Sequence, residues 1–221
     1  YVVKNPGYNI NTDLTPVIHV VGVPHMILVR ADSKINTLAE LIQYAKGKSG
    51  PTFISTTARY VAGHTSAEML AMLTGANFVS VPHNNLGQAQ TTFLSEGAEV
   101  HIDTWQTSLP LIQSGKAKYI AVTTARRLDA LKSLPTVAET IPGFDVSPWT
   151  AIFAHSSVSK PIVDRLNTLV NQALKDPKFQ ETFLKYSQTD VGGSPERLQQ
   201  IIRRDQAEFK KIATKLNIQP E

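Results

Sequence analysis

The sequence of 221 residues contains no cysteine. This absence excludes disulfide bonds, thiolate catalysis and metal sites built from cysteine, and it is compatible with a bacterial periplasmic protein. No stretch approaches the roughly 18 consecutive apolar residues of a membrane-spanning helix. The chain also has no signal-like N-terminus and begins with Tyr1. We therefore expect a processed or trimmed product from which any export signal has been removed.

Several motifs of enzymes and metal sites are missing as well. Gly47-Lys48-Ser49 resembles the end of a phosphate-binding loop, but Ile42 stands where that motif needs glycine, and Gly50-Pro51 follows instead of a helix. No G-x-S-x-G or H-E-x-x-H motif occurs. His64 and Glu68 share one helix face, yet two ligands do not make a metal site and a structural pair is favoured. The sequence thus predicts no catalytic residue, no metal and no cofactor.

The charge of the chain is modest, with a net value of +4. A small positive charge suits an anionic small ligand. Basic residues gather near the C-terminus, but there they alternate with Glu196, Asp205 and Glu208 in a helical pattern. This alternation favours a solvated helix face over a nucleic-acid site, so no nucleic-acid partner is expected.

Short apolar runs alternate with helical patterns between residues 52 and 123. The predicted strands are 52–55, 78–81, 99–102 and 119–123, and the helices between them are 62–74, 87–96 and 105–114. Gly75, Gly97 and Gly115 follow these helices, at positions that favour a left-handed residue. Strict alternation of strand and helix predicts an α/β fold with a parallel or mostly parallel sheet, covered on both faces.

The segments on either side of this region do not form a sheet of their own. Two strands are predicted at 17–21 and 26–30, a helix at 37–46, and a further strand at 149–154. The rest of the chain has helical patterns over 161–174, 177–186 and 195–216, each with a proline at its start. We expect one complete α/β lobe at residues 31–149. Residues 1–30 and 150–221 would then form part of a second, incomplete lobe.

Polar residues follow three of the predicted strands, at the points where helices begin. They are Ser55-Thr56-Thr57, Pro82-His83-Asn84-Asn85 and Asp103-Thr104-Trp105. In open parallel sheets such loops bind ligands, and hydroxyls, amides and helix N-termini suit a carboxylate. Capping of the following helices is the alternative explanation, but repetition at three junctions favours binding. Arg59 is a candidate partner for a second carboxylate, and Trp105 either stacks on an aromatic ligand or belongs to the core.

A series of short stretches runs along essentially the whole chain in a fixed order. They are Asp13–Val17, Val29–Asp32, Thr37–Leu41, Ser55 with His64 and Glu68, Val81-Pro82, Asp103, Ser114–Lys116, Ala121–Thr123, Leu134–Glu139 with Pro142–Phe144, Trp149 and Lys160–Asn167. Leu134–Glu139 is the most specific of them. In this order and spacing the chain resembles the substrate-binding proteins of bacterial tripartite tricarboxylate transporters, the Bug family.

The resemblance implies a two-lobed fold like that of type II periplasmic binding proteins, which captures a small organic carboxylate for a membrane permease. It implies a periplasmic location and no enzymatic activity. Its ligand loops fall on Ser55, Thr56 and Thr57 and on toward His64, on His83 and Asn84, and on Asp103 and Thr104. Arg59, in a first loop that is longer than the family's, completes a set of nine candidate residues: Ser55, Thr56, Thr57, Arg59, His64, His83, Asn84, Asp103 and Thr104. Family members also carry a long N-terminal segment, with the opening strands of one lobe and a glycine-rich ligand loop, which we expect this chain to lack.

Two other interpretations stay open at this point. In the first, an enzyme or metal-binding protein has reused the fold, with a site made of His64, His83, His101 and Asp103. In the second, the chain is a truncated module without ligand capture. Its incomplete lobe would then be filled by another copy, giving a homodimer, because missing strands would leave apolar surface exposed.

Overall fold

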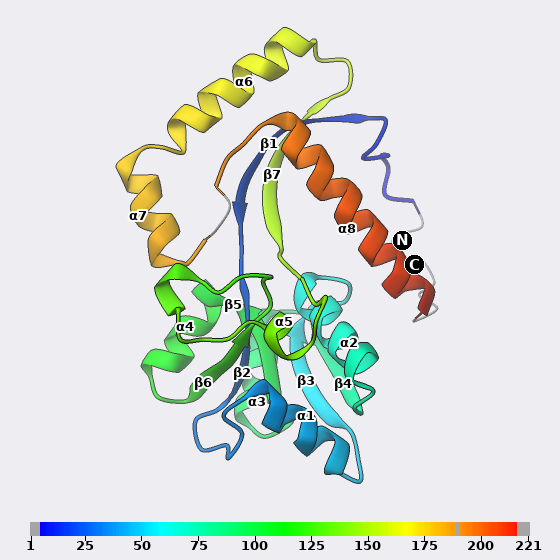
Figure 1. Cartoon of the computed structure of the whole chain (residues 1–221), viewed down its shortest axis with the longest axis vertical. Helices are drawn as coiled ribbons and strands as arrows, with labels where there is room; N and C mark the ends of the chain where they lie inside the picture. Colours follow the sequence, from blue (N-terminus) through cyan, green and yellow to red (C-terminus); the bar gives the residue numbers. More distant parts are fainter. Residues whose placement is uncertain (1–4, 189–190, 216–221) are drawn as a thin grey trace. The chain divides into compact units, whose positions relative to one another are not determined.

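A computed structural model describes residues 5–188 and 191–215 of the chain (Figure 1). The chain forms two compact units: unit 1 comprises Tyr1–Gly22 and Trp149–Glu221, and unit 2 comprises Val23–Pro148. The sequence analysis predicts a boundary after residue 30. This prediction is wrong for residues 25–30, which belong to unit 2. Strand β2 (His25–Arg30) is hydrogen-bonded to two strands of unit 2, so the boundary lies between Gly22 and Val23.

Unit 2 contains a five-stranded sheet in the order β4-β3-β5-β2-β6. The other strands are β3 (Thr52–Thr57), β4 (Phe78–His83), β5 (Val100–Thr104) and β6 (Ala117–Val122). β3 is parallel to β4 and β5, whereas β2 is antiparallel to β5 and β6. Four strands therefore share one direction, which confirms a mostly parallel sheet, and β2 is the single strand of this sheet that runs against them.

Helices cover both faces of this sheet. They are α1 (Leu38–Gly47), α2 (Ala62–Thr74), α3 (Leu86–Leu94), α4 (Trp105–Gln113) and α5 (Val137–Thr140), with a short 3-10 helix η1 at Asp129–Leu131. Successive side chains of a strand point to opposite faces. Thr56 and Ile102 share the face on which the first turn of α2 lies, and Ser55 and His101 share the face on which α3 lies.

Three glycines are predicted to follow helices in a left-handed conformation, and two of them do so. Gly75 and Gly115 adopt left-handed backbone angles, with φ of 63° and 68°. Gly97 does not, because Glu96 takes the left-handed position with φ of 66°. A side chain at Gly97 would meet Thr92 at 2.9 Å, so this glycine serves a close approach of the chain to α3.

Unit 1 is a two-stranded sheet covered by helices. β1 (Leu14–Gly22) pairs antiparallel with β7 (Trp149–His155), and α6 (Lys160–Ala173), α7 (Pro177–Lys185) and α8 (Pro195–Lys215) follow. The Trp149 indole donates to the Asp205 carboxylate at 2.7 Å and fastens β7 to α8. Asn167 of α6 donates to the Val17 carbonyl at 2.8 Å. Across the parts of the chain that the structure describes, no helix combines the length and apolarity needed to cross a membrane.

Gly75 and Gly47 both lie at helix ends, and together they make a matched test of backbone conformation. Gly75→Ala places a side chain on left-handed backbone in open space, so we expect a loss of about 1 kcal/mol of unfolding free energy. Gly47→Ala lies in the last turn of α1, also in open space but without the left-handed angle. It should be neutral or stabilising by about 0.5 kcal/mol. Denaturant unfolding of both variants checks the opposite signs, and equal effects would contradict the assignment.

Candidate functional site

The three polar junctions meet at one edge of the unit 2 sheet. β3 lies between β4 and β5, with Thr57 opposite His83 and Thr56 opposite Ile102. The three strands run in the same direction, so their carboxyl ends and the loops that follow lie side by side. This edge is where open α/β sheets bind ligands.

The hydroxyls of Ser55 and Thr56 face the packed interior at this edge. Both residues are fully buried. Ser55 Oγ donates to the Ala89 carbonyl at 2.7 Å, and Thr56 Oγ1 lies 3.4 Å from Ser80 Oγ. These two side chains therefore hold β3 against its neighbours, and the donors available to a ligand begin at Thr57, which is only partly buried.

His83 is likewise committed to its neighbours. Its Nδ1 lies 3.3 Å from the Thr56 carbonyl, and its Nε2 lies 2.7 Å from Thr92 Oγ1. A carbonyl only accepts, so Nδ1 carries the hydrogen and Nε2 accepts from the threonine when the ring is neutral. Asn84, the next residue, is exposed. At this junction the side-chain amide of Asn84 is accessible, and the imidazole of His83 fixes the end of β4.

The helices that start at this edge differ in how they are capped. Asn85 accepts from Gln88 N at 3.0 Å and caps α3, and Thr104 accepts from Thr107 N at 3.2 Å and caps α4. The capping alternative thus explains two of the three junctions. Val61 offers α2 no side-chain cap, and the first turn of α2 has no acidic residue. The first turns of α3 and α4 also contain no acidic residue, so the missing side-chain cap is what distinguishes α2 among these three helices.

The N-terminus of α2 lies close to the sheet because its second residue is Gly63. A Cβ at this position would lie 3.2 Å from the backbone oxygen of Ile102 and 3.7 Å from the Thr56 Cβ. The first intrahelical hydrogen bond runs from Thr65 N to the Val61 oxygen at 2.9 Å. The preceding amides, at residues 62–64, consequently have no intrahelical partner.

The loop before α2 adds positive charge and backbone strain. Ala58 and Tyr60 have left-handed backbone angles, with φ of 29° and 62°, and Arg59 between them is exposed. The Tyr60 ring packs edge-on against the His64 ring, with centroids 5.7 Å apart. Burial and then the Arg59 charge lower the pKa of His64, while burial raises the pKa of Glu68. Their closest atoms are 3.8 Å apart, so His64 and Glu68 form a weak pair.

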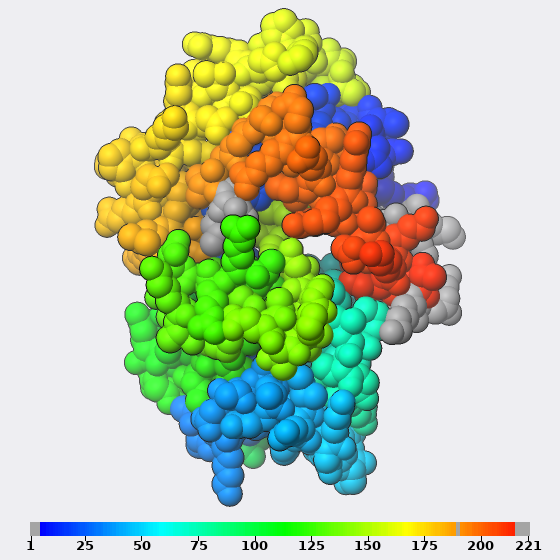
Figure 2. All heavy atoms as spheres, in the orientation of Figure 1, coloured from blue at the N-terminus to red at the C-terminus, as the bar shows by residue number. Residues whose placement is uncertain are grey.

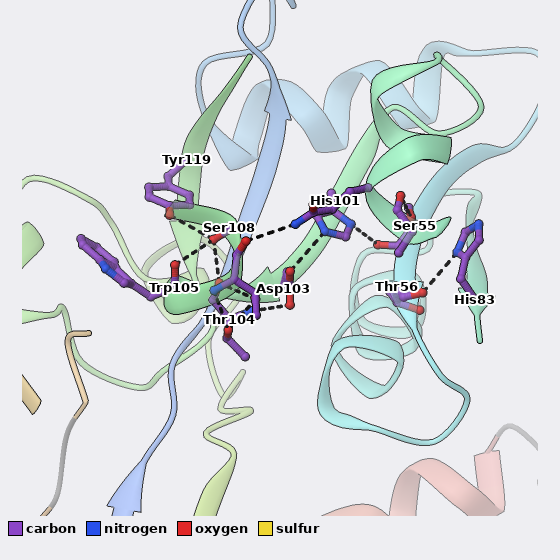
Figure 3. Close-up of polar contacts among 12 residues, drawn as sticks. Ser55, Thr56, His83, His101, Asp103, Thr104, Trp105, Ser108 and Tyr119 are labelled. Carbon is purple, nitrogen blue, oxygen red and sulfur yellow. Dashed lines mark hydrogen bonds and ion pairs between the residues drawn. The ribbon is translucent and has the colours of Figure 1, made fainter. Parts of the chain in front are cut away.

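A second polar cluster lies on the other face of the sheet (Figure 3). His101 Nδ1 is 3.0 Å from the Ser55 carbonyl and Nε2 is 3.5 Å from Asp103 Oδ2, while Asp103 Oδ1 accepts from Thr104 N at 2.8 Å. Ser108 Oγ lies 3.0 Å from the Tyr119 hydroxyl. Burial raises the pKa of Tyr119 to about 12, so its phenol is neutral at physiological pH.

Trp105 belongs to the core and not to the accessible surface of the site. Its side chain is buried and stacks on Tyr119, with ring centroids 5.7 Å apart and planes 27° apart. Of the two roles that the sequence leaves open for this residue, the structure supports packing.

Two residues at this edge escape the sequence analysis. His25 begins β2 opposite Thr104, and burial lowers its pKa although the Asp103 carboxylate opposes that shift. Gly63 could have been noticed as a glycine within the first turn of a predicted helix. Among the described residues, no group of three or more histidine, aspartate or glutamate side chains is arranged to hold a metal ion.

Comparison with known proteins places this geometry in context. The model of the "Tripartite tricarboxylate transporter family receptor" family matches residues 1–218. A UPF0065 protein of Pseudomonas sp. strain P51 is 24% identical over 207 residues, which cover 93% of this chain and 62% of that protein. Protein BugT of Bordetella pertussis is 28% identical over 191 residues, which cover 86% of this chain and 59% of that protein. The chain thus spans about three fifths of these curated relatives.

Solved structures agree with the fold. A structure titled "R. palustris Rpa4515 with adipate" has a TM-score of 0.86 and 30% identity, and the match covers all of this chain and 74% of that one. The periplasmic binding protein BugD has a TM-score of 0.83 and 29% identity, with 75% of its chain covered. MatC of Rhodopseudomonas palustris, with bound malate, matches at a TM-score of 0.77 and 22% identity over 93% of this chain and 71% of its own.

The environment of His64 predicts how it titrates. We expect its pKa below the ordinary value of 6.5, first because of burial and second because of Arg59. The folded state then binds this proton less tightly than the unfolded state, so the contribution of His64 costs stability as the pH falls below about 6.5. Nuclear magnetic resonance (NMR) titration should show the midpoint rising in Arg59→Gln. Lys116→Gln, a control before β6 at the opposite edge, should leave it unchanged.

Proposed function

Because the chain belongs to the tripartite tricarboxylate transporter receptor family, we propose that the whole protein is a solute receptor that binds a small organic carboxylate. The carboxylate binds at the N-terminus of α2. The adipate-bound relative, at 30% identity over all of this chain, supports a dicarboxylate as the class of ligand.

The observation that carries the proposal is the uncapped first turn of α2. Amides at residues 62–64 point out of a helix whose N-terminus lacks both a side-chain cap and an acid. A hydrogen bond to a charged group contributes about 1.5–3 kcal/mol. Three or four such bonds sustain the roughly 8 kcal/mol of micromolar binding. Of the nine candidate residues, Thr57, Arg59 and Asn84 have accessible side chains, at the ends of β3 and β4 and in the loop before α2.

The other six candidate residues then have supporting roles. Ser55, Thr56 and His83 fix the ends of β3 and β4, and Asp103 with Thr104 fixes the start of α4. His64 lies within the first turn of α2 beside Arg59. The site holds hydrogen-bond donors without an activated nucleophile, and the related proteins are binding proteins, so binding without catalysis is proposed.

The same family membership suggests the setting of this activity. The receptor would deliver its ligand to a membrane permease of a tripartite tricarboxylate transporter. It would do so in the periplasm, since the structural relative BugD is a periplasmic binding protein. The absence of cysteine is compatible with that compartment.

The charge of Arg59 gives the sharpest test of the ligand class. Arg59→Ala should weaken binding of adipate about tenfold, because the distal carboxylate loses a charge-assisted partner. Binding of a monocarboxylate of similar length should fall by less than threefold. Calorimetric titration of both ligands measures the difference, with Lys116→Ala at the opposite edge as a control of equal charge change. Equal losses for the two ligands, or equal effects of the two variants, would contradict the proposal.

A homodimer is favoured by one feature of unit 1. Helix α6 exposes a stripe at helical spacing, made of Ile162, Leu166 and Leu169, whose exposed fractions are 54%, 38% and 42%. Phe179 and Leu184 of α7 are also exposed. Figure 2 shows the yellow and gold atoms of α6 and α7 at the surface in this view. Two-stranded sheets such as β1–β7 are marginal alone, and a second copy would cover these residues.

Self-association of the chain is the expected outcome of light scattering at tens of micromolar. Leu166→Glu should shift the chain toward monomer, because a charge in the stripe is costly to bury. Thr168→Glu adds the same charge at another exposed position of α6 and should leave the oligomeric state unchanged. A monomer for the unaltered chain would reject this second candidate.

A further inference from the structure

The buried cluster on the α3 side of the sheet contains two side chains, His101 and Asp103, that each direct one polar atom at the other. His101 is fully buried and Asp103 is 4% exposed. His101 Nε2 and Asp103 Oδ2 face each other at 3.5 Å, and within the described residues neither atom has a hydrogen-bond partner. The remaining polar atoms of both side chains are occupied, His101 Nδ1 by the Ser55 carbonyl and Asp103 Oδ1 by Thr104 N.

The partner of Nδ1 determines how the imidazole is protonated. The Ser55 carbonyl only accepts, so the hydrogen of a neutral His101 must be on Nδ1. Nε2 would then direct a lone pair at an oxygen of Asp103. Two buried acceptors facing each other without a hydrogen would both be left unsatisfied, which is costly. One additional proton, on Nε2 or on the carboxyl group, removes this conflict.

His25 and Tyr119 are neutral, and the guanidinium of Arg30 on β2 is bonded to the Phe93 and Ala98 carbonyls. Burial lowers the pKa of His25 from β2 and raises the pKa of Tyr119 from β6 to about 12, so both are neutral near pH 7. The helices packed on this face, α3 and α4, contain no charged residue in their sequences LGQAQTTFL and WQTSLPLIQ. The carboxylate of Asp103 thus has His101 as the facing group that can neutralise it.

We propose that His101 and Asp103 hold one proton between them, and that this shared proton makes them positioning residues of the ligand site. The proton completes a sequence of contacts from Ser55 of β3, through His101 and Asp103, to Thr104 at the start of α4 (Figure 3). Ser55 lies two residues before Thr57, the last residue of β3, which the loop 58–61 follows. The pair therefore fixes two of the loops at the binding edge relative to each other.

This inference rests on the proposed function only where ligand affinity is concerned. Without the shared proton, two lone pairs would face each other and the ends of β3 and β5 would be less firmly held together. Ligand affinity is then expected to fall. An asparagine at position 103 would replace the shared proton by a fixed one, since its amide donates to a neutral Nε2 and its oxygen still accepts from Thr104 N.

The proton is counted directly by NMR on the free, full chain with labelled histidine and aspartate. At neutral pH, nitrogen shifts of His101 and the carboxyl shift of Asp103 should report one proton beyond that on Nδ1. In Asp103→Asn the Nε2 signal should be that of an unprotonated nitrogen, because the introduced asparagine amide donates to it. No shared proton in the unaltered chain, or a proton on each of the two groups at neutral pH, would overturn the inference.

Adipate titration supplies the functional readout. His101→Leu should weaken adipate binding about tenfold, and Asp103→Asn should weaken it less, because the sequence of contacts stays complete. Equal losses in the two variants would overturn the coupling. If the unaltered chain binds no carboxylate, the proposed function fails and the NMR count alone decides the proton.

Discussion

The close approach of helix α2 to strand β5 is the constraint on which the proposed site depends. Glycine at position 63 favours it, because a Cβ there would lie 3.2 Å from the Ile102 backbone oxygen, closer than most Cβ contacts. The approach brings the unpaired amides of the first turn to the carboxyl edge of the sheet, beside the accessible end of β3. A helix set further out would lose the alignment with Thr57 and the strained loop that carries Arg59. The packing of the α2 backbone against β5 thus determines where the side chains of the proposed site lie.

The neighbouring helices show why one junction is singled out. Asn85 and Thr104 each bond one amide in the first turns of α3 and α4, whereas α2 has no such side-chain cap. At α2 the proposed ligand would take the place of that cap. The histidines on either side of β3 contribute rigidity, since His83 holds the Thr56 carbonyl and His101 holds the Ser55 carbonyl. An anion at α2 therefore meets donors whose positions are fixed in advance.

Local patterns predicted much of this fold, and non-local pairing limited the rest. The strand and helix alternation was readable because each element carries its own periodicity, and α2 begins and ends at the predicted residues. The place of β2 was not readable, because its partners β5 and β6 lie some 70 to 90 residues further along the chain. The edge itself was predicted by the order of polar residues, but not the direction of each side chain. Ser55 and Thr56 point into the packing because strands alternate, and His101 gained significance only beside Asp103.

The central claim is that a carboxylate binds the first turn of α2. The most direct measurement is amide NMR of the isotope-labelled chain during titration with adipate. The account predicts that the largest shifts, saturating together, occur at the amides of Ala62, Gly63 and His64, while the first-turn amides of α3 change little. Saturable binding whose largest shifts lie at α3 or α4, with residues 62–64 unmoved, would contradict it.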